Sequence, residues 1–391
     1  MRIAYVIDNI TSFGGIQRIT VAKASYFASI GYDVYIIVSD VSGPKALLEQ
    51  LDERVSVIDT GTRLYEFDFK PGLINRIKRE LKPLIMFRRL RKTLKLINPD
   101  ILISVGLSEK YMIPLLSIGK KWITIREFHN NKLYRLYDVQ YSGKDIMHKL
   151  KSYLSHFIEF HTCLSHHDCT VVLTREDKLS NWGNRNDIRV IPNPLRLAGT
   201  PLSSNGESHK VVTLSRITRI KRPDHLIAAW TIIHRVAPDW ILEIWGPIDK
   251  EYGESLKKQI SDARLNNSVH LCGAVHDVGR VLSSASIFAY ASSYDGLPLV
   301  LLEAMSCGLP CVSYTCPCGP KDIISDGIDG LWVKNGDVQD IADKLLMLIR
   351  DEDKRKRMGK AAIEKSKQYS MEKIGQMWLA LFEELVSKPK Q

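Results

Sequence analysis

The sequence predicts an α/β protein built from two doubly wound domains that face each other across a cleft. Short apolar runs, each followed by a polar turn and a helical pattern, recur along the chain, as in parallel sheets covered by helices. A chain of 391 residues is too long for one compact core and fits two domains. A stretch rich in Pro, Gly, Ser and Asn separates the apolar runs into two sets.

Each apolar run is short enough to be one buried strand. The first set is RIAYVID, DVYIIVSD, DILISVG, WITIREF, TVVLT and IRVIPNP, and the second is KVVTLSR, WILEIWG, SVHLCG, IFAYASS, PCVSY and GLWVK. We expect an amino-terminal domain over 1–192, a linker over 193–210 and a carboxyl-terminal domain over 211–370. A last helix over 371–391 is expected to pack back on the amino-terminal domain. Such sheets bind ligands at the carboxyl ends of their strands.

Composition predicts a folded protein, and the lack of a membrane-spanning or signal-peptide pattern predicts that it is cytoplasmic. Hydrophobic residues make up 45% and charged residues 25% of the chain, as in globular proteins. No apolar run reaches the roughly 18–20 residues of a membrane-spanning helix. The first strand meets Asp8 and lacks the longer apolar core of a signal peptide.

The seven cysteines predict neither disulfides nor a metal site. Cys316 and Cys318 form a C-P-C pair, but no histidine or second cysteine pair nearby completes a zinc spacing. We interpret the pair as a feature of a loop. The other cysteines have apolar neighbours and are expected in the core: Cys163, Cys169, Cys272, Cys307 and Cys311.

Positive charge is concentrated in one segment of the first half. The net formal charge is +11, which favours an anionic partner. Residues 76–95 contain only one acid, Glu80. They contain nine basic residues: Arg76, Lys78, Arg79, Lys82, Arg88, Arg89, Arg91, Lys92 and Lys95.

Helical spacing within this basic segment allows two interpretations. Phe87, Leu90, Leu94 and Ile97 recur on one face of a helix that we expect to run from Pro83 to Ile97. The helix could lie on the anionic inner face of a membrane, where each cation contributes about 1 kcal/mol and the apolar side chains enter the interface. Alternatively, it packs on the sheet and keeps a solvated basic face.

Glycines after the first strand do not form a dinucleotide-binding motif. The chain has Gly14-Gly15 but no G-x-G-x-x-G, in either half, which argues against a dehydrogenase. The pair could let a ligand approach backbone amides at the start of the helix that holds Arg18, or it could form only a tight turn.

Two cations follow the first strand of the second half. Arg216 comes just after "KVVTL" and Lys221 lies five residues later, before a helix. At the carboxyl end of a strand they could hold a diphosphate by charge-assisted hydrogen bonds. The alternative is a charged surface loop.

Two acids occur in "SYDGLPLVLLEAMSCGL". Asp295 precedes a Gly-Leu-Pro bend at the end of a predicted strand, and Glu303 lies one turn into the next helix among apolar residues. A half-buried carboxylate needs hydrogen-bond donors, which the hydroxyls of a ligand would supply. The two acids therefore predict a site for a polyhydroxylated anionic ligand.

These segments resemble the family 4 retaining glycosyltransferases, whose GT-B fold consists of two facing Rossmann-like domains. The resemblance rests on "GGIQR", "LSRITRIK", "DGLPLVLLEAMSCGLP" and "GIDGLWV", in that order, and covers nearly all of the chain. The third block is the acid-x7-acid motif of the family. Family members usually carry Glu at the first acid, where this chain has the shorter Asp295.

The resemblance implies a nucleotide-sugar donor held by the second domain. Glu303 would bind the ribose hydroxyls and Arg216 and Lys221 the phosphates, while Asp295 would grip the donor sugar. Other residues that the resemblance places at the donor are Gly296, Leu297, Pro298 and Leu299 through their backbone, Val275 in the loop "CGAVHD" at the base, Gly14 and Gly15 at the phosphate, and Asn193.

On the acceptor side, the segment "IREFHNN" occupies the place where the family puts polar residues facing donor sugar and acceptor. Glu127 and His129 are the candidates there, and the alternative for His129 is a satisfied loop histidine. With Asp295, Arg216 and Lys221 they complete the expected set of catalytic residues.

The predicted activity is transfer of a sugar, with retention of configuration, from a UDP-sugar to a hydroxyl of a growing, lipid-linked surface glycan. The enzyme would need no metal or other cofactor and would bind an anionic membrane surface through residues 76–97, on the inner face of the cell membrane. A nucleotide-sugar epimerase of the same fold and an inactive sugar-binding subunit are the alternatives. A nucleic-acid-binding protein would leave the acid pair without a role, and the basic helix lacks stacking aromatics.

Overall fold

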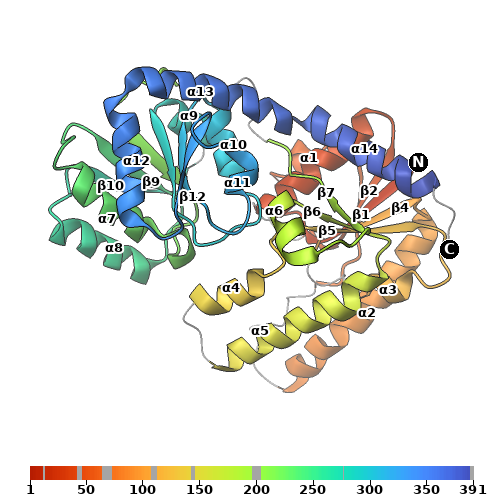
Figure 1. The fold of residues 1–391 in the computed structure, drawn as a ribbon. Coiled ribbons are helices and arrows are strands. Elements are labelled where there is room, and N and C mark those ends of the chain that lie inside the picture. The colour runs from red at the N-terminus through yellow and green to blue at the C-terminus, as the bar shows by residue number, and fades with distance from the viewer. Residues whose placement is uncertain are drawn as a thin grey trace.

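The fold agrees with the predicted class. A computed structural model describes residues 1–11, 14–41, 46–63, 73–106, 112–141, 146–195, 204–275 and 277–387. These residues form two α/β domains, each with one parallel sheet covered by helices (Figure 1). The two domains are the Rossmann-like halves that the strand and helix pattern predicts.

Seven parallel strands make up the amino-terminal sheet, in the order β3-β2-β1-β4-β5-β6-β7. Ile3 of the central β1 pairs with Val34 of β2 on one side and with Ile101 of β4 on the other, so the strand order reverses at β1. The short edge strand β3 was not among the six predicted. The strands are β1 (Arg2–Asn9), β2 (Asp33–Asp40), β3 (Ser56–Asp59), β4 (Ile101–Ser104), β5 (Ile123–Phe128), β6 (Cys169–Val172) and β7 (Ile188–Val190).

Helices of this domain cover both faces of the sheet and extend below it (Figure 1). They are α1 (Gly15–Ser29), α2 (Leu73–Ile97), α3 (Ile113–Leu116), α4 (Tyr134–Tyr141), α5 (Ile146–Ile158) and α6 (Arg175–Asp177). Helix α2 begins ten residues before Pro83 and continues through it, so the predicted start at Pro83 is wrong. Pro83 is exposed within the helix.

The apolar stripe of α2 packs on the sheet. Leu90 and Leu94 are buried with Leu102 of β4, and Phe87 packs against the same cluster. These side chains therefore cannot insert into a membrane interface in this fold. The alternative interpretation, in which the apolar stripe packs on the sheet, is correct for this stripe. The cations of α2 remain outside: Arg88, Arg89, Arg91, Lys92 and Lys95 are exposed, whereas the side chains of residues 76–80 lie outside the described ones.

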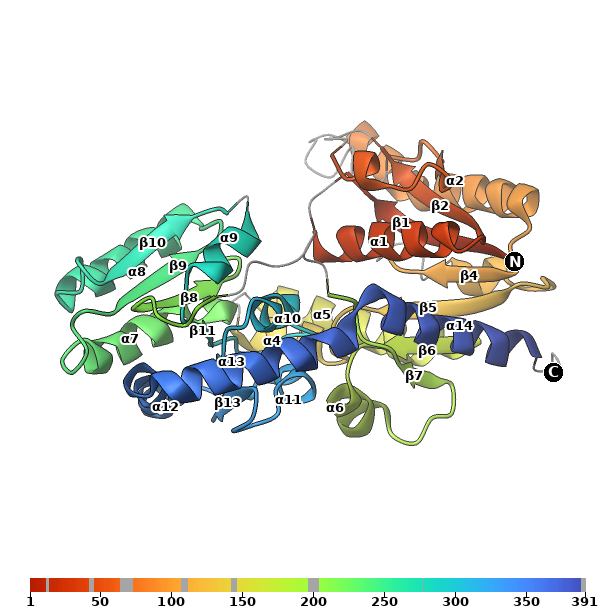
Figure 2. The same cartoon turned by 90° about the horizontal axis from the view of Figure 1, so that it is seen from above.

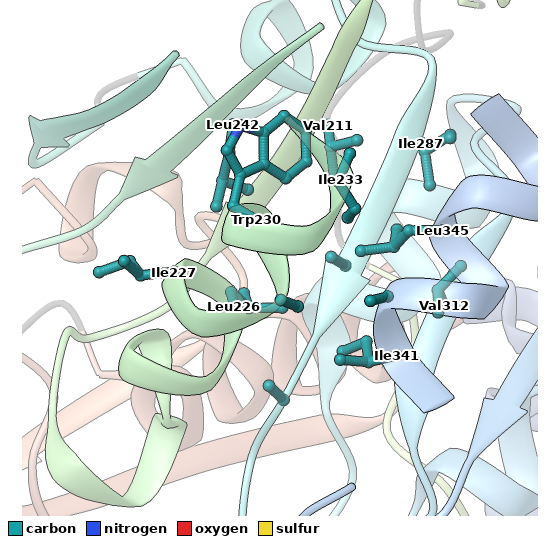
Figure 3. Close-up of a cluster of buried hydrophobic side chains, with 14 of the residues drawn as sticks. Val211, Leu226, Ile227, Trp230, Ile233, Leu242, Ile287, Val312, Ile341 and Leu345 are labelled. Carbon is teal, nitrogen blue, oxygen red and sulfur yellow. The ribbon is translucent and has the colours of Figure 1, made fainter. Parts of the chain in front are cut away.

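Six parallel strands form the carboxyl-terminal sheet, in the order β10-β9-β8-β11-β12-β13. They are β8 (Lys210–Leu214), β9 (Ile241–Trp245), β10 (Val269–Gly273), β11 (Ile287–Tyr290), β12 (Cys311–Tyr314) and β13 (Gly330–Val333). The helices are α7 (Pro223–Ile233), α8 (Lys250–Asp262), α9 (Val278–Ser283), α10 (Leu299–Ser306), α11 (Pro320–Ile323), α12 (Val338–Arg350) and α13 (Glu352–Ser366). Trp230 of α7 is fully buried among aliphatic side chains of the sheet and of α12 (Figure 3).

The last helix, α14 (Met371–Ser387), returns to the amino-terminal domain, as Figures 1 and 2 show. Trp378 and Phe382 are buried in the core of that domain, where the ring of Phe382 lies 5.5 Å from that of Phe27. Arg189 of β7 forms an ion pair with Glu384. The chain thus crosses between the domains twice, and α13 and α14 span the second crossing.

No helix among the described residues combines the length and the apolar character needed to cross a bilayer.

Candidate active site

The residues predicted to carry chemistry follow strands of the carboxyl-terminal sheet. Lys221 ends a short 3-10 turn (Arg219–Lys221) after β8, and Asp295 lies in the loop after β11. The strands β8 and β11 are neighbours in the sheet, because Ile287 pairs with Val211. Carboxyl ends of adjacent parallel strands meet at one edge, so residues 74 positions apart in the sequence come into contact.

At this edge Lys221, Tyr290 and Asp295 form one hydrogen-bonded cluster. The ammonium of Lys221 pairs with Oδ2 of Asp295 and donates to the Tyr290 hydroxyl at 2.9 Å. The Tyr290 hydroxyl in turn donates to Asp295 Oδ2. Burial alone would raise the pKa of Asp295, but Lys221 and these hydrogen bonds hold it below its ordinary value. The carboxylate is therefore charged at neutral pH, and its geometry is fixed.

Sequence reasoning predicted the two charged members of this cluster and missed Tyr290. Its position was the available signal, because it is the last residue of β11, directly before the loop that carries the acid. Burial and Asp295 raise its pKa well above the ordinary value, so Tyr290 remains a protonated donor.

The backbone at Asp295 is held from two sides. Its amide donates to the carbonyl of Pro317 at 2.9 Å, and its carbonyl accepts from the amide of Cys318 at 3.2 Å. From the amino-terminal domain, Asn131 Nδ2 donates to the same carbonyl at 2.7 Å. The C-P-C segment is thus a loop that supports the acid. The thiols of Cys316 and Cys318 are buried, and burial raises the pKa of both.

Arg216 also lies at this edge but is exposed. It follows β8 beside Gly246, whose backbone leaves no room for a side chain, since a Cβ there would lie 1.6 Å from the carbonyl oxygen of Ser215. Tyr294 is close enough to Arg216 for the guanidinium to oppose the rise of its pKa, which burial brings to about 12. The Tyr294 ring stacks on Tyr137 of α4 with 5.3 Å between centroids.

Glu303 is the fifth residue of α10, as predicted for the second acid. It is half-buried, whereas Leu301, Leu302, Ala304 and Met305 around it are buried. Pro298 precedes the helix without a side-chain cap, and its carbonyl accepts from the amide of Leu301 at 3.0 Å, so the amides of Leu299 and Val300 are the ones that could meet a ligand. The structure thus places the acid-x7-acid segment on a strand end, a bend and the first turn of a helix.

Glu127 is buried and paired within the amino-terminal domain. Its carboxylate is only 1% exposed and forms a buried ion pair with Lys23 of α1, so it does not face a cleft. Burial lowers the pKa of Lys23. Burial alone would raise the pKa of Glu127, but Lys23, His129 and Arg126 together hold it below its ordinary value. The Lys23 ammonium lies 4.6 Å from the Trp378 ring, so this pair also contacts α14. Sequence spacing could not reveal a partner 104 residues away.

His129 is also largely buried, with a side chain 4% exposed. Its Nε2 lies 3.4 Å from Glu127 Oε1, and its Nδ1 lies 3.4 Å from Asn193 Nδ2. Burial lowers the pKa of His129 to about 4, although Glu127 opposes the shift. The ring is therefore neutral at pH 7, and the structure brings three predicted residues, Glu127, His129 and Asn193, together.

The two domains touch at Gly296. A Cβ on this glycine would lie 2.5 Å from the carbonyl oxygen of His129 and 3.1 Å from the Cα of Asn130. With the hydrogen bond from Asn131 to Asp295, this contact joins the loop after β5 to the loop after β11. Leu297 and Pro298, which follow, are buried, and Leu299 is half-buried.

Three further predicted residues lie at other loops. Gly14 is the residue before α1, and Gly15 is exposed at its first position, with nothing within 4 Å of a Cβ. Val275 follows β10 and packs partly against the core that also contacts Trp245 and Leu299. The next residue, His276, lies outside the described residues. Among those described, no three His, Cys, Asp or Glu side chains are grouped to hold a metal ion.

Comparison with known proteins gives a family match over the carboxyl-terminal domain, which holds Arg216, Lys221, Asp295 and Glu303. Residues 200–365 match the family Glycosyl transferases group 1. An uncharacterized glycosyltransferase of Haemophilus influenzae is 27% identical over 384 residues, which cover 96% of this chain and 98% of that protein. The poly(ribitol-phosphate) α-N-acetylglucosaminyltransferase of Staphylococcus aureus is 28% identical over 54% of this chain and 43% of its own length.

Solved structures share the whole fold. HepE of Anabaena in complex with UDP-glucose aligns with a TM-score of 0.74 at 16% identity, over 98% of this chain and 100% of that chain. TarM of Staphylococcus aureus, in a complex that contains UDP, aligns with a TM-score of 0.73 at 18% identity, over 97% and 99%. At these identities the likeness shows the fold alone, which is the GT-B arrangement. With the relatives above, it indicates a glycosyltransferase that acts in glycan synthesis.

Proposed function

We propose that this group 1 glycosyltransferase moves a sugar from a UDP-sugar to a hydroxyl of a growing glycan, with retention of configuration. The observation that carries the proposal is the cluster of Lys221, Tyr290 and Asp295 at the edge of the family-matched domain. Neighbours of the same fold in complex with UDP and with UDP-glucose support the choice of donor.

The Lys221 ammonium can donate hydrogen bonds to the donor phosphate and to protein side chains at the same time. An ammonium has three N–H donors, of which Asp295 and Tyr290 take two. The third is left for a phosphate oxygen, with the exposed Arg216 as a second cation. Asp295 and the backbone of 296–299 would bind the sugar, Glu303 the ribose hydroxyls, and the loop with Val275 the base.

Negative charge grows on the diphosphate as its bond to the sugar breaks. Lys221, Arg216 and the first amides of α10 would stabilise that charge, and because Lys221 is already positioned, little reorganisation is needed. These cations supply the positive charge that a metal ion would otherwise provide, so we propose catalysis without a metal. A diphosphate oxygen on the same face of the sugar would take the proton of the acceptor hydroxyl.

The amino-terminal domain would position the acceptor. Glu127 is engaged by Lys23 and cannot act as the nucleophile of a double displacement from there. His129 is neutral and touches the donor loop through its backbone, so we assign it a positioning role with Asn193 and Asn131. The acceptor is proposed to be a lipid-linked glycan, met at the inner face of the cell membrane.

A nucleotide-release assay over a panel of UDP- and GDP-sugars tests this function. We expect UDP release from a UDP-sugar only when a glycan acceptor is present, at a rate unchanged by EDTA, and an NMR spectrum of the product that shows the anomeric configuration of the donor. An epimerase would convert the donor sugar without a glycan. An inactive sugar-binding subunit would bind donors without turnover, and inversion of the anomeric centre would contradict the proposed mechanism.

Replacing Glu303 with glutamine should weaken UDP binding by about 10- to 100-fold, because hydrogen bonds to a charged acceptor contribute about 1.5–3 kcal/mol. Calorimetry with UDP and with 2′-deoxy-UDP measures this directly. The parent should bind the deoxy compound more weakly, and Glu303→Gln should add little to that loss. Glu254→Gln, an exposed acid of α8, is the matched control. If the losses of binding free energy from Glu303→Gln and from removal of the 2′-hydroxyl were fully additive, Glu303 would not bind the ribose.

A further inference from the structure

Helix α5 presents its apolar side chains to solvent. Seven large hydrophobic residues of this thirteen-residue helix are between 38% and 79% exposed: Ile146, Met147, Leu150, Tyr153, Leu154, Phe157 and Ile158. In Figure 1 the helix runs along the lower edge of the amino-terminal domain. So many exposed apolar side chains on one helix indicate a contact surface.

The exposed residues form one continuous stripe. At about 100° per residue they cover an arc of about 140°, from Tyr153 to Ile158. Ser152, on the opposite face, is buried, so the polar face of α5 is turned toward the domain. A helix of a water-facing domain has the reverse orientation. Lys149 and Lys151, both exposed, border the stripe on its two sides.

The orientation of α5, and with it the exposure of the stripe, is fixed by packing against the domain. Helix α5 continues into a π-helical turn (Glu159–Cys163) whose Phe160 is buried. The Phe160 ring lies 5.5 Å from that of Phe128 at the end of β5 and 5.4 Å from that of Trp182. The carboxyl-terminal end of α5 is therefore anchored in an aromatic cluster, and the domain fixes which face points outward.

Charge decides which partner fits this surface. Helix α2, which carries the exposed Arg88, Arg91, Lys92 and Lys95, also runs along the lower side of this domain in Figure 1. A second copy of this chain would bring like charges together across the stripe, whereas anionic lipid headgroups would pair with them. We infer that α5 lies in the surface of an anionic bilayer, with its apolar stripe among the acyl chains and the cations of α2 at the headgroups.

This surface is connected to the proposed active site. Helices α4 and α5 are consecutive, and Tyr137 of α4 stacks on Tyr294, the residue before Asp295. A bilayer under α5 would bring a lipid-linked acceptor to the side of the molecule that contacts the donor loop. Delivery of a lipid-linked acceptor rests on the proposed function. Membrane binding by α5 does not, because it can be measured without any substrate.

Flotation of the full chain with vesicles tests the inference. The parent should float with vesicles of equal parts phosphatidylglycerol and phosphatidylcholine, and not with phosphatidylcholine alone. The triple variant Leu150→Ser, Leu154→Ser, Phe157→Ser should bind at least tenfold more weakly at low salt. The quadruple variant Arg88→Ser, Arg91→Ser, Lys92→Ser, Lys95→Ser should also bind more weakly, and its remaining binding should respond less to salt than that of the parent.

Leu179→Ser, Val236→Ser, Ile328→Ser is the matched control, since these residues are also exposed apolar side chains but lie outside α5. It should float like the parent. UDP affinity should be the same in all variants, which shows that the fold is intact. If the α5 variant floats like the parent, the inference is wrong. If the parent sediments as a dimer that only the α5 variant dissociates, and flotation does not change, the stripe is a self-association surface instead.

Discussion

Replacing Lys221 with methionine should lower kcat by about 10²–10³-fold, the loss typical of removing one preorganised group that stabilises developing charge. Methionine keeps much of the aliphatic length and removes the ammonium that joins Asp295, Tyr290 and the proposed phosphate. Since charge on the leaving diphosphate is larger in the transition state than in the bound donor, kcat should fall more than UDP affinity. Steady-state kinetics with a saturating acceptor, together with calorimetry for UDP, measures both.

Arg219→Met is the matched control for Lys221→Met. Arg219 lies two residues earlier in the same turn, is exposed, and its guanidinium stacks over the Tyr252 ring at 5.0 Å rather than reaching Asp295. Its loss should change kcat less than threefold. A Lys221 variant with normal kcat and a raised KM would show that the ammonium only holds the donor in the ground state.

The positions of the candidate residues in the carboxyl-terminal domain could be predicted because their signals are local. Asp295 and Glu303 are separated by one bend and one helical turn, and the strand pattern before them fixes which end of the sheet they occupy. The strand pattern likewise places Arg216 and Lys221 at the neighbouring strand end. The two α/β domains could be predicted from the alternation of strand and helix patterns. Each of these patterns can be recognised within a short stretch of sequence.

What sequence reasoning missed depends on contacts between distant residues. The family resemblance suggested that Glu127 faces a cleft, but its carboxylate is buried and paired with Lys23 of α1, which in turn contacts Trp378 of α14. The stripe of α2 was compatible with a membrane or a sheet, and only packing against Leu102 and its neighbours decides for the sheet. A helical period shows that a face is apolar, but not what covers that face.

Substituting Gly296 with alanine should lower kcat by about 10- to 100-fold while UDP affinity stays within twofold of the parent. The new Cβ would lie 2.5 Å from the carbonyl oxygen of His129, so the loops after β5 and β11 could not keep their present contact. Asn131 would then lose its hydrogen bond to Asp295, and the loop after β11, which we propose binds the sugar, would shift relative to the loop after β5. Misplacement of reacting groups by about 1 Å can cost 10²-fold in rate.

Gly359→Ala separates this effect from a simple loss of packing. A Cβ on Gly359 of α13 would lie 2.2 Å from the carbonyl oxygen of Gly308, but both residues belong to the carboxyl-terminal domain. We expect this variant to lose about 1–3 kcal/mol of stability through overpacking and to keep its kcat when folded. Gly296→Ala should show the opposite pattern, with an unchanged Tm and a low kcat. An active Gly296→Ala enzyme would mean that the contact between His129 and Gly296 is absent during turnover, and that the acceptor meets the donor in a more open arrangement of the two domains.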